Sequence, residues 1–178
     1  MLQTIAKAPL EWPVEGYRRA PFWVYHDEEI YAREQERIFR GPAWHFLALE
    51  AELPDPGDFK STFIGDTPVV VTRDTDGKLH GFVNRCAHRG SLVCLEHSGK
   101  GRKRFTCVYH AWSYDLQGNL SNAAFRNGVR GEGGMPKDFE LRDHGLQKLR
   151  VESYYGIIFG TMSAATEPLE QYLGGPAT

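Results

Sequence analysis

Apolar residues in the first quarter of the chain follow a helical spacing. Between Asp27, which is suited to cap a first turn, and the helix-ending pair Gly41 and Pro42, they recur so as to share one face. The residues on this face are Ile30, Tyr31, Ile38 and Phe39. The preceding segment, through Arg19, is rich in turn-forming and aromatic residues, and we expect an extended arm laid over another surface.

Beyond Pro42 the spacing becomes alternating, as in Trp44, Phe46 and Ala48, and turn-forming residues separate short apolar runs. Strands are expected at 44–48, 59–63, 69–71, 79–83, 104–108, 112–115, 120–123, 146–153 and 155–161. A hairpin is predicted at Asp76-Gly77, a glycine-rich loop over 126–138, and the start of a short helix near the end of the chain. This pattern predicts a mainly β fold, an antiparallel sandwich or barrel preceded by the arm and one α-helix.

Composition narrows the function classes. The 178 residues carry 21 Lys and Arg against 23 Asp and Glu, a net charge of -2, so there is no positive excess to bind nucleic acid. No run of 18 apolar residues and no secretory signal is present, which argues against a membrane or export role. The three cysteines are Cys86, Cys94 and Cys107, too few and too odd in number for a disulfide framework. Thiols of a metal or redox site in a reducing cytoplasm fit better, with Cys94 expected to be a small buried apolar residue.

Two short motifs each combine a cysteine with a histidine. Cys86 and His88 form a C-x-H step, and Cys107 and His110 form a C-x2-H step. Two loop tips brought together by the sheets would present two thiolates and two imidazoles. This donor set is that of the Rieske [2Fe-2S] centre, in which two histidines replace two cysteines on one iron.

Two other interpretations of these residues remain open at this point. The four side chains could be buried thiols and hydrogen-bonded histidines of an ordinary core. They could also hold a zinc ion in a structural interaction module, although zinc sites favour closely paired cysteines or paired histidines.

The motifs resemble those of one family, the large (alpha) subunits of Rieske aromatic-ring-hydroxylating dioxygenases. The similar stretches are CAHRG, CVYHAW, YDLQGNL and AREQERIFRGPAWHFLALEAELPDPGDFK. GVRGEGGMPKDF and HGLQKLRVESYYG are most similar to the subgroup that acts on anthranilate, salicylate or terephthalate. The likeness covers nearly the whole chain.

The resemblance implies a [2Fe-2S] cluster with Cys86 and Cys107 on one iron and His88 and His110 on the other. It implies that His110 is the electron exit, hydrogen-bonded to an aspartate of a neighbouring subunit. Arg89, Ser91, Tyr109 and Trp112 would surround the cluster, with backbone amides near Arg89, Ser91 and Trp112 donating to its sulfides. Ala111 stands where the family usually has glycine. Trp112 stands where high-potential Rieske proteins have a donor serine, so we expect a potential toward the low end of the Rieske range.

The resemblance also implies a domain organisation: arm and helix at 1–42, a Rieske domain at 43–163 and the start of a catalytic domain at 164–178. Ring hydroxylation needs a mononuclear iron held by two histidines and a carboxylate. The other histidines are His26, His45, His80, His97 and His144, and none forms a suitable pair. Asp143-His144 is expected to be a solvated pair in a loop. The mononuclear Fe(II) is therefore expected only in a catalytic domain absent from these residues.

The function expected is electron transfer from NADH, through a reductase and a ferredoxin, to oxygen-dependent hydroxylation of an aromatic acid. Small (beta) subunits and neighbouring alpha subunits are the implied partners. The alternative is a stand-alone Rieske-type ferredoxin, although the residues before the first ligand loop exceed what a minimal carrier needs. The basic residues between the motifs are Lys100, Arg102, Lys103 and Arg104, either a solvated loop or a docking surface for an acidic redox partner.

Overall fold

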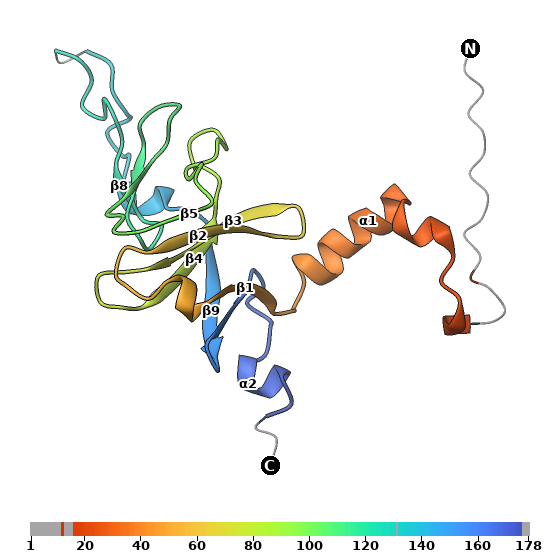
Figure 1. The fold of residues 1–178 in the computed structure, drawn as a ribbon. Helices are drawn as coiled ribbons and strands as arrows, with labels where there is room; N and C mark the ends of the chain where they lie inside the picture. Colours follow the sequence, from red (N-terminus) through yellow and green to blue (C-terminus); the bar gives the residue numbers. More distant parts are fainter. Residues whose placement is uncertain (1–11, 13–15, 131, 176–178) are drawn as a thin grey trace, which may run out of the picture.

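A computed structural model describes residues 12, 16–130 and 132–175. It contains a β domain, a helical arm that projects from this domain, and a short helix α2 (Leu169–Tyr172) near the C-terminal end (Figure 1). All strand pairs are antiparallel, so the predicted mainly β, antiparallel fold is confirmed. No helix in the described part of the chain is long and apolar enough to cross a membrane.

The arm is helical over most of its described length. Its elements are η1 (Gly16–Arg18), η2 (Phe22–Tyr25), α1 (Glu28–Glu34) and the π-helical η3 (Gln35–Phe39). Asp27 caps α1 as predicted, since its carboxylate accepts hydrogen bonds from the amides of Glu29 at 3.0 Å and Ile30 at 3.1 Å. A Cβ at Gly41 would overlap the carbonyl oxygen of Arg37, so the chain can leave the helix here only at a glycine. Of the extended arm expected through Arg19, 1–11 and 13–15 lie outside the described residues, and Gly16–Arg18 forms a 3-10 turn instead.

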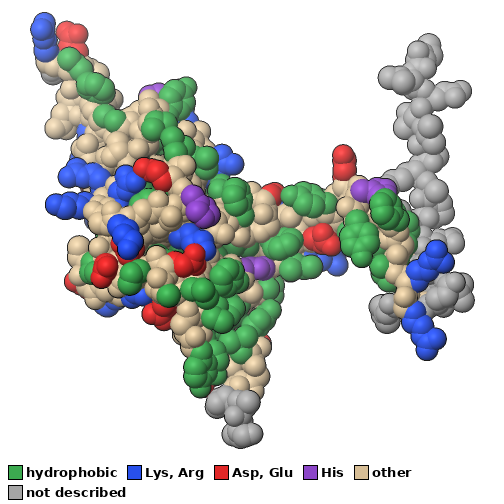
Figure 2. All heavy atoms as spheres, viewed as in Figure 1, with side chains coloured by type: hydrophobic (Ala, Val, Ile, Leu, Met, Phe, Trp, Pro, Cys, Tyr) green, Lys and Arg blue, Asp and Glu red, His purple; other side chains and the backbone are tan. Residues whose placement is uncertain are grey.

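The apolar face expected on this helix is not covered by the β domain. No residue of α1 is buried, and Tyr31 and Ile38 are 53% and 49% exposed. Of this face, Phe39 alone packs against a core cluster of the β domain among the described residues. Figure 2 shows apolar side chains along the projecting arm, so most of this helical face is not buried against the β domain.

The β domain consists of a large curled sheet and a small one. The strands are β1 (His45–Leu49), β2 (Phe59–Ile64), β3 (Thr67–Arg73), β4 (Leu79–Val83), β5 (Ser98–Gly99), β6 (Phe105–Thr106), β7 (Ser113–Tyr114), β8 (Leu120–Asn122), β9 (Lys148–Tyr154) and β10 (Ile157–Thr161), with 3-10 turns η4 (Glu50–Glu52) and η5 (Leu141–His144). The large sheet has the order β1-β10-β9-β4-β3-β2-β5, and the small sheet has the order β6-β7-β8. The predicted Asp76-Gly77 hairpin joins β3 to β4, and no strand forms in the described part of 126–138, as expected.

Two apolar cores lie on opposite faces of the central strand β3. Val69 and Val71 belong to the core enclosed by the curled sheet, whereas Val70 belongs to the core shared with the small sheet. All three valines are fully buried because both faces of the strand are covered. The second core contains Cys86 and Cys107 and therefore carries the candidate site.

The alternation expected for the first strand is wrong in detail. Phe46 is 54% exposed, while Leu47 and Ala48 are both buried. The pairing of β1 with β10 shifts register between Phe46 and Ala48, so a bulge turns two successive side chains inward.

Candidate metal centre

The two Cys/His motifs fold into turns of the same kind. In each, the cysteine amide donates to the carbonyl five residues later, and the cysteine carbonyl accepts from the amide four residues later. The N···O distances are 2.8 Å for Cys86 to Ser91 and Gly90 to Cys86, 2.8 Å for Cys107 to Trp112 and 2.9 Å for Ala111 to Cys107. The unequal spacings C-x-H and C-x2-H are therefore carried on equivalent backbones.

A buried asparagine that follows β4, Asn84, holds the loop of the first Cys/His motif in place through its side chain. The side-chain oxygen of Asn84 accepts from the amides of Val93 at 3.0 Å and Cys94 at 2.9 Å, and its nitrogen donates to the Cys94 carbonyl at 2.8 Å. These three bonds hold the chain on both sides of the turn that contains Cys86. Asn84 could not be identified from the sequence, since a single asparagine after a strand carries no distinctive signal.

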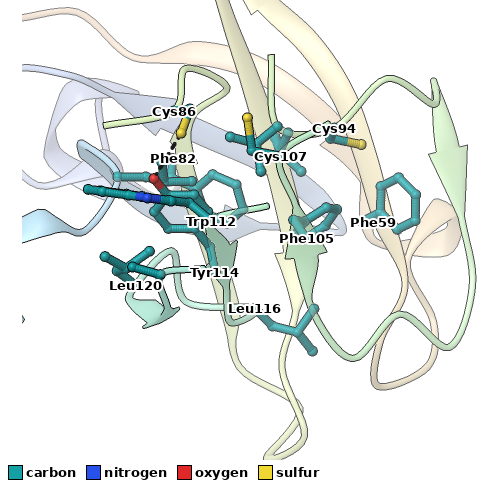
Figure 3. Packing of buried hydrophobic residues seen from close by; sticks show 14 of the residues in the cluster. Phe59, Phe82, Cys86, Cys94, Phe105, Cys107, Trp112, Tyr114, Leu116 and Leu120 are labelled. Carbon is teal, nitrogen blue, oxygen red and sulfur yellow. Dashed lines mark hydrogen bonds between the residues drawn. The ribbon is translucent and has the colours of Figure 1, made fainter. Parts of the chain in front are cut away.

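The four predicted ligand residues come together at one end of the second core. Cys86 and Cys107 are buried, and Figure 3 shows their sulfur atoms at the same end of the core, beyond the rings of Trp112 and Tyr114. The ring centroids of His88 and His110 are 4.6 Å apart. None of the three cysteines forms a disulfide.

The strongest evidence that the two cysteines and two histidines could hold a metal cluster comes from His88. The Nδ1 atom of His88 is buried and has no hydrogen-bond partner, a costly state for a polar atom unless it serves as a ligand. Burial, followed by the neighbouring His110 and Arg89, lowers the pKa of His88, and the neutral imidazole that results is the form that binds metal. Within the described ranges, no group of three His, Cys, Asp or Glu side chains is arranged around a single metal-ion position.

Tyr114 contributes a hydrogen bond to this site that the sequence analysis missed. Its buried hydroxyl lies 3.2 Å from the Cys86 sulfur and accepts from the Ala87 amide at 3.1 Å. Because the amide occupies the oxygen as an acceptor, the hydroxyl proton is free to point at the sulfur. Burial and Cys86 together raise the pKa of Tyr114, so the proton stays on the oxygen. The available signal was the strand expected at 112–115, in which alternation places Tyr114 on the same side as Trp112.

The residues predicted to surround the ligands lie in different environments. Arg89 is exposed and Ser91 is half-buried next to the first turn. Tyr109 is largely exposed, with its ring centroid 3.9 Å from that of His110. Trp112 is buried and stacks on His88, with 4.8 Å between centroids.

The expectation that Asp143 and His144 form a solvated pair is wrong for His144. It is half-buried, stacks on Phe139 with 4.4 Å between ring centroids, and meets the edge of Trp112 at 5.9 Å. Asp143 remains exposed and contacts Arg142 across 3.8 Å. The reason for the difference is the Phe139 ring, because stacking on it stabilises the imidazole of His144 in a partly buried position.

Of the four basic residues between the two motifs, one is paired and three are exposed. Arg102 forms an ion pair with Glu96 at 2.6 Å and covers the Phe59 ring at 4.9 Å, so it is part of the fold. Lys100, Lys103 and Arg104 are exposed.

The third cysteine, Cys94, is buried as predicted. Its sulfur accepts a hydrogen bond from the Ser61 hydroxyl at 3.4 Å, and burial raises the pKa of its thiol.

Known proteins share both the sequence and the fold. Residues 43–131 match the Rieske [2Fe-2S] domain. The chain is 55% identical over 165 residues to the anthranilate 1,2-dioxygenase large subunit of Burkholderia cepacia, covering 93% of this chain and 39% of the relative. It is 47% identical over 168 residues to the salicylate 5-hydroxylase large oxygenase component of a Ralstonia species, covering 92% and 40%.

Solved structures agree with the sequence matches. A mutant naphthalene 1,2-dioxygenase bound to phenanthrene superposes with a TM-score of 0.76 at 34% identity, covering 85% of this chain and 32% of that one. A quaternary ammonium Rieske monooxygenase in complex with an inhibitor gives 0.76 at 31% identity, covering 89% and 42%. The chain spans about 40% of the length of the curated relatives it matches first. Since the family match covers half of the chain and contains both Cys/His turns, this protein belongs to the Rieske [2Fe-2S] domain family.

Proposed function

We propose that this chain is the electron-transfer part of a ring-hydroxylating oxygenase large subunit. Cys86 and Cys107 hold one iron of a [2Fe-2S] cluster, and His88 and His110 hold the other. The observation that carries the assignment is the buried Nδ1 of His88, which has no partner in a site that also gathers two buried thiols and a second histidine. The cluster, when bound, supplies one-electron chemistry.

The residues around the cluster divide the work. Tyr114 donates to the Cys86 sulfur and stabilises the added negative charge of the reduced state. Trp112 excludes water on the His88 side. His110 is half-buried beside an apolar pocket of about 410 Å3 lined by Val108, Tyr109, Phe125 and Met135 among others. We assign His110 as the electron exit, because an accepting subunit could approach its imidazole across this surface.

The domain organisation forms part of the same proposal. Residues 1–42 form the arm and helix, 43–163 form the cluster-carrying domain, and 164–178 begin a catalytic domain. The projecting arm supports this division (Figure 1), since Tyr31 and Ile38 on its helix are exposed and find no cover in the β domain. The oxygen-activating mononuclear Fe(II) would belong to the catalytic domain of the whole protein.

The substrate proposed for the whole protein is an aromatic acid, supported by the names of the anthranilate, terephthalate and salicylate relatives at 55%, 48% and 47% identity. The proposed partners are a reductase, a ferredoxin, small (beta) subunits and neighbouring alpha subunits, with NADH as the electron source. An acidic electron donor could dock on the exposed basic residues Lys100, Lys103 and Arg104. Arg102 is not part of this surface charge, because it is paired with Glu96. A cytoplasmic location belongs to the same proposal, because thiols that hold iron suit a reducing compartment.

A stand-alone ferredoxin is not favoured. The match to dioxygenase large subunits extends over 93% of the chain, so it includes most of the arm and helix that a minimal carrier does not need.

The test is an electron paramagnetic resonance spectrum of the dithionite-reduced protein, purified without air, with iron and sulfide counted on the same sample. A rhombic signal with an average g of about 1.9 and two irons per chain is expected for mixed Cys and His ligation. A colourless protein with a single zinc ion would overturn the proposal. Oxygen-dependent turnover of anthranilate, salicylate and terephthalate by the full-length protein with its redox partners then tests the substrate class.

A further inference from the structure

The indole of Trp112 lies flat against the imidazole of His88. The ring centroids are 4.8 Å apart and the planes differ by 8°. By contrast, His88 meets His110 at an interplanar angle of 70°. Rotation of the His88 ring about its bond to Cβ would break the stack, so the stack favours one ring plane.

No hydrogen bond from the described residues sets this plane. Among the residues that the structure describes, none donates to or accepts from a ring nitrogen of His88, and Nδ1 is buried. Metal-binding histidines usually donate their second ring N–H to a carboxylate or carbonyl, and this bond fixes the ring orientation. In this chain the aromatic stack with Trp112 takes over the role of that second hydrogen bond in fixing the ring orientation.

Trp112 is itself held by two further rings. Phe139 meets its edge at 5.7 Å and 70°, and His144 meets its edge at 5.9 Å and 75°. Phe139 and His144 stack on each other at 4.4 Å and 12°. Trp112 and Phe139 are both buried in the core that contains the two ligand cysteines. The segment after the glycine-rich loop therefore reaches back and braces the second ligand turn.

The two histidines are held differently. The nearest ring to His110 is that of Tyr109, which is tilted by 36° and largely exposed. A buried, coplanar neighbour constrains an imidazole more tightly than an exposed, tilted one. His88 is thus the constrained member of the pair, and His110 is the one that can adjust to a partner.

From this geometry we infer that Trp112, braced by Phe139 and His144, is a positioning residue that fixes the ring plane of His88 and so keeps Nδ1 directed at the iron. The inference deepens the proposed function and rests on it, because it requires His88 to be a ligand. Trp112 acts through His88 and need not touch the cluster with its side chain.

The test compares Trp112→Leu, which keeps an apolar side chain but removes the flat surface, with Trp112→Phe, which restores a flat ring. Phe105→Leu is the matched control, since Phe105 is buried in the same core and its ring contacts are with other phenylalanines and Arg102. Each variant is made in the full-length protein. Two quantities are measured: the 14N couplings of the reduced cluster by pulsed electron paramagnetic resonance, and the rate of iron loss to a chelator.

We expect Trp112→Leu to shift or broaden one of the two histidine nitrogen couplings and to lose iron about tenfold faster, the scale typical of removing an orienting contact. Trp112→Phe should restore both values to near those of the native protein. Phe105→Leu should leave the nitrogen couplings unchanged even where it lowers overall stability.

Native couplings and native iron loss in Trp112→Leu would overturn the inference, as would equal changes in the Leu and Phe variants. A coupling change shared with Phe105→Leu would also overturn it, because general loosening of the core would then be the cause. If the Leu variant does not accumulate, Trp112→Met, whose flexible side chain fills irregular space, takes its place. A native protein without two irons would overturn the proposed function itself, which separates the two failures.

Discussion

Gly90 and Ala111 occupy the same place in the two Cys/His turns. Each lies four residues after its cysteine, donates its amide to the cysteine carbonyl and adopts a positive φ, 70° for Gly90 and 54° for Ala111. The left-handed conformation costs glycine nothing but costs alanine about 1 kcal/mol or more. The second turn therefore keeps its shape against a local strain that the first turn avoids.

Replacing Ala111 with Gly should stabilise the folded protein by about 0.5–1 kcal/mol, because relief of the strain exceeds the added entropy of the unfolded chain. The measurement is the thermal midpoint of the cluster-loaded protein, which should rise by about 2–4 °C. A lower midpoint would contradict the strain assigned to this turn.

The matched control is Gly90→Ala. A Cβ at Gly90 meets nothing within 4 Å, so the substitution introduces backbone strain without a clash. Stability should fall by about 1 kcal/mol, opposite in sign to the change at Ala111.

Replacing Tyr114 with Phe should lower the reduction potential. The variant keeps the buried ring but removes the hydroxyl that lies 3.2 Å from the Cys86 sulfur, and with it the hydrogen bond proposed above to stabilise the reduced cluster. A one-electron shift of about 60 mV corresponds to about 1.4 kcal/mol, the strength of one such bond. Protein-film voltammetry measures the shift. Tyr109→Phe serves as the control, because the Tyr109 side chain is largely exposed, and an equal fall there would show that the Cys86 contact is not the cause.

Replacing His110 with Cys should retain a [2Fe-2S] cluster of lower potential. A third thiolate adds negative charge to the cluster and opposes reduction, moving the potential below the Rieske range of about -150 to +300 mV. A potential that stays constant or rises would contradict the assignment of His110 as a ligand.

Asp74 should make stability depend on pH at the acid end. Burial raises the pKa of its carboxyl, but hydrogen bonds from His80, the Lys78 amide and Gln117 outweigh this effect and lower the pKa to about 2, from 3.8. Because the folded-state value is the lower one, the ionised carboxylate stabilises the fold above about pH 4, and this contribution disappears as the pH falls toward 2.

Asp74→Asn should therefore lower the free energy of unfolding by about 2 kcal/mol at neutral pH, with the difference from the native protein shrinking below about pH 4. Urea unfolding followed by tryptophan fluorescence across this range measures it. Asp76→Asn, at an exposed position of the same turn, should show little change at any pH. A constant deficit for Asp74→Asn across all pH values would show that ionisation of Asp74 does not contribute.

Local sequence signals predicted much of this molecule. Asp27 before an apolar repeat marked the helix start, Asp76-Gly77 marked a hairpin, and the strand 79–83 was predicted with the bounds of β4. The spacing of Cys86, His88, Cys107 and His110 identified a Rieske-type donor set. These features depend on residues close together in the chain, where capping, turn chemistry and alternation act directly.

Tertiary structure decided the rest. A bulge in β1 exposes Phe46, which alternation had placed with buried residues, and the helix face of Tyr31 and Ile38 finds no cover in the β domain. The hydroxyl of Tyr114 reaches Cys86 across 28 positions, and His144 reaches Trp112 across 32. The candidate ligand residues could be recognised in the sequence because metal chemistry restricts ligands to a few residue types at short spacing. Their supports could be identified only from the packed structure, since any buried tyrosine or aromatic ring can supply such a contact and only the meeting of distant segments selects which one does.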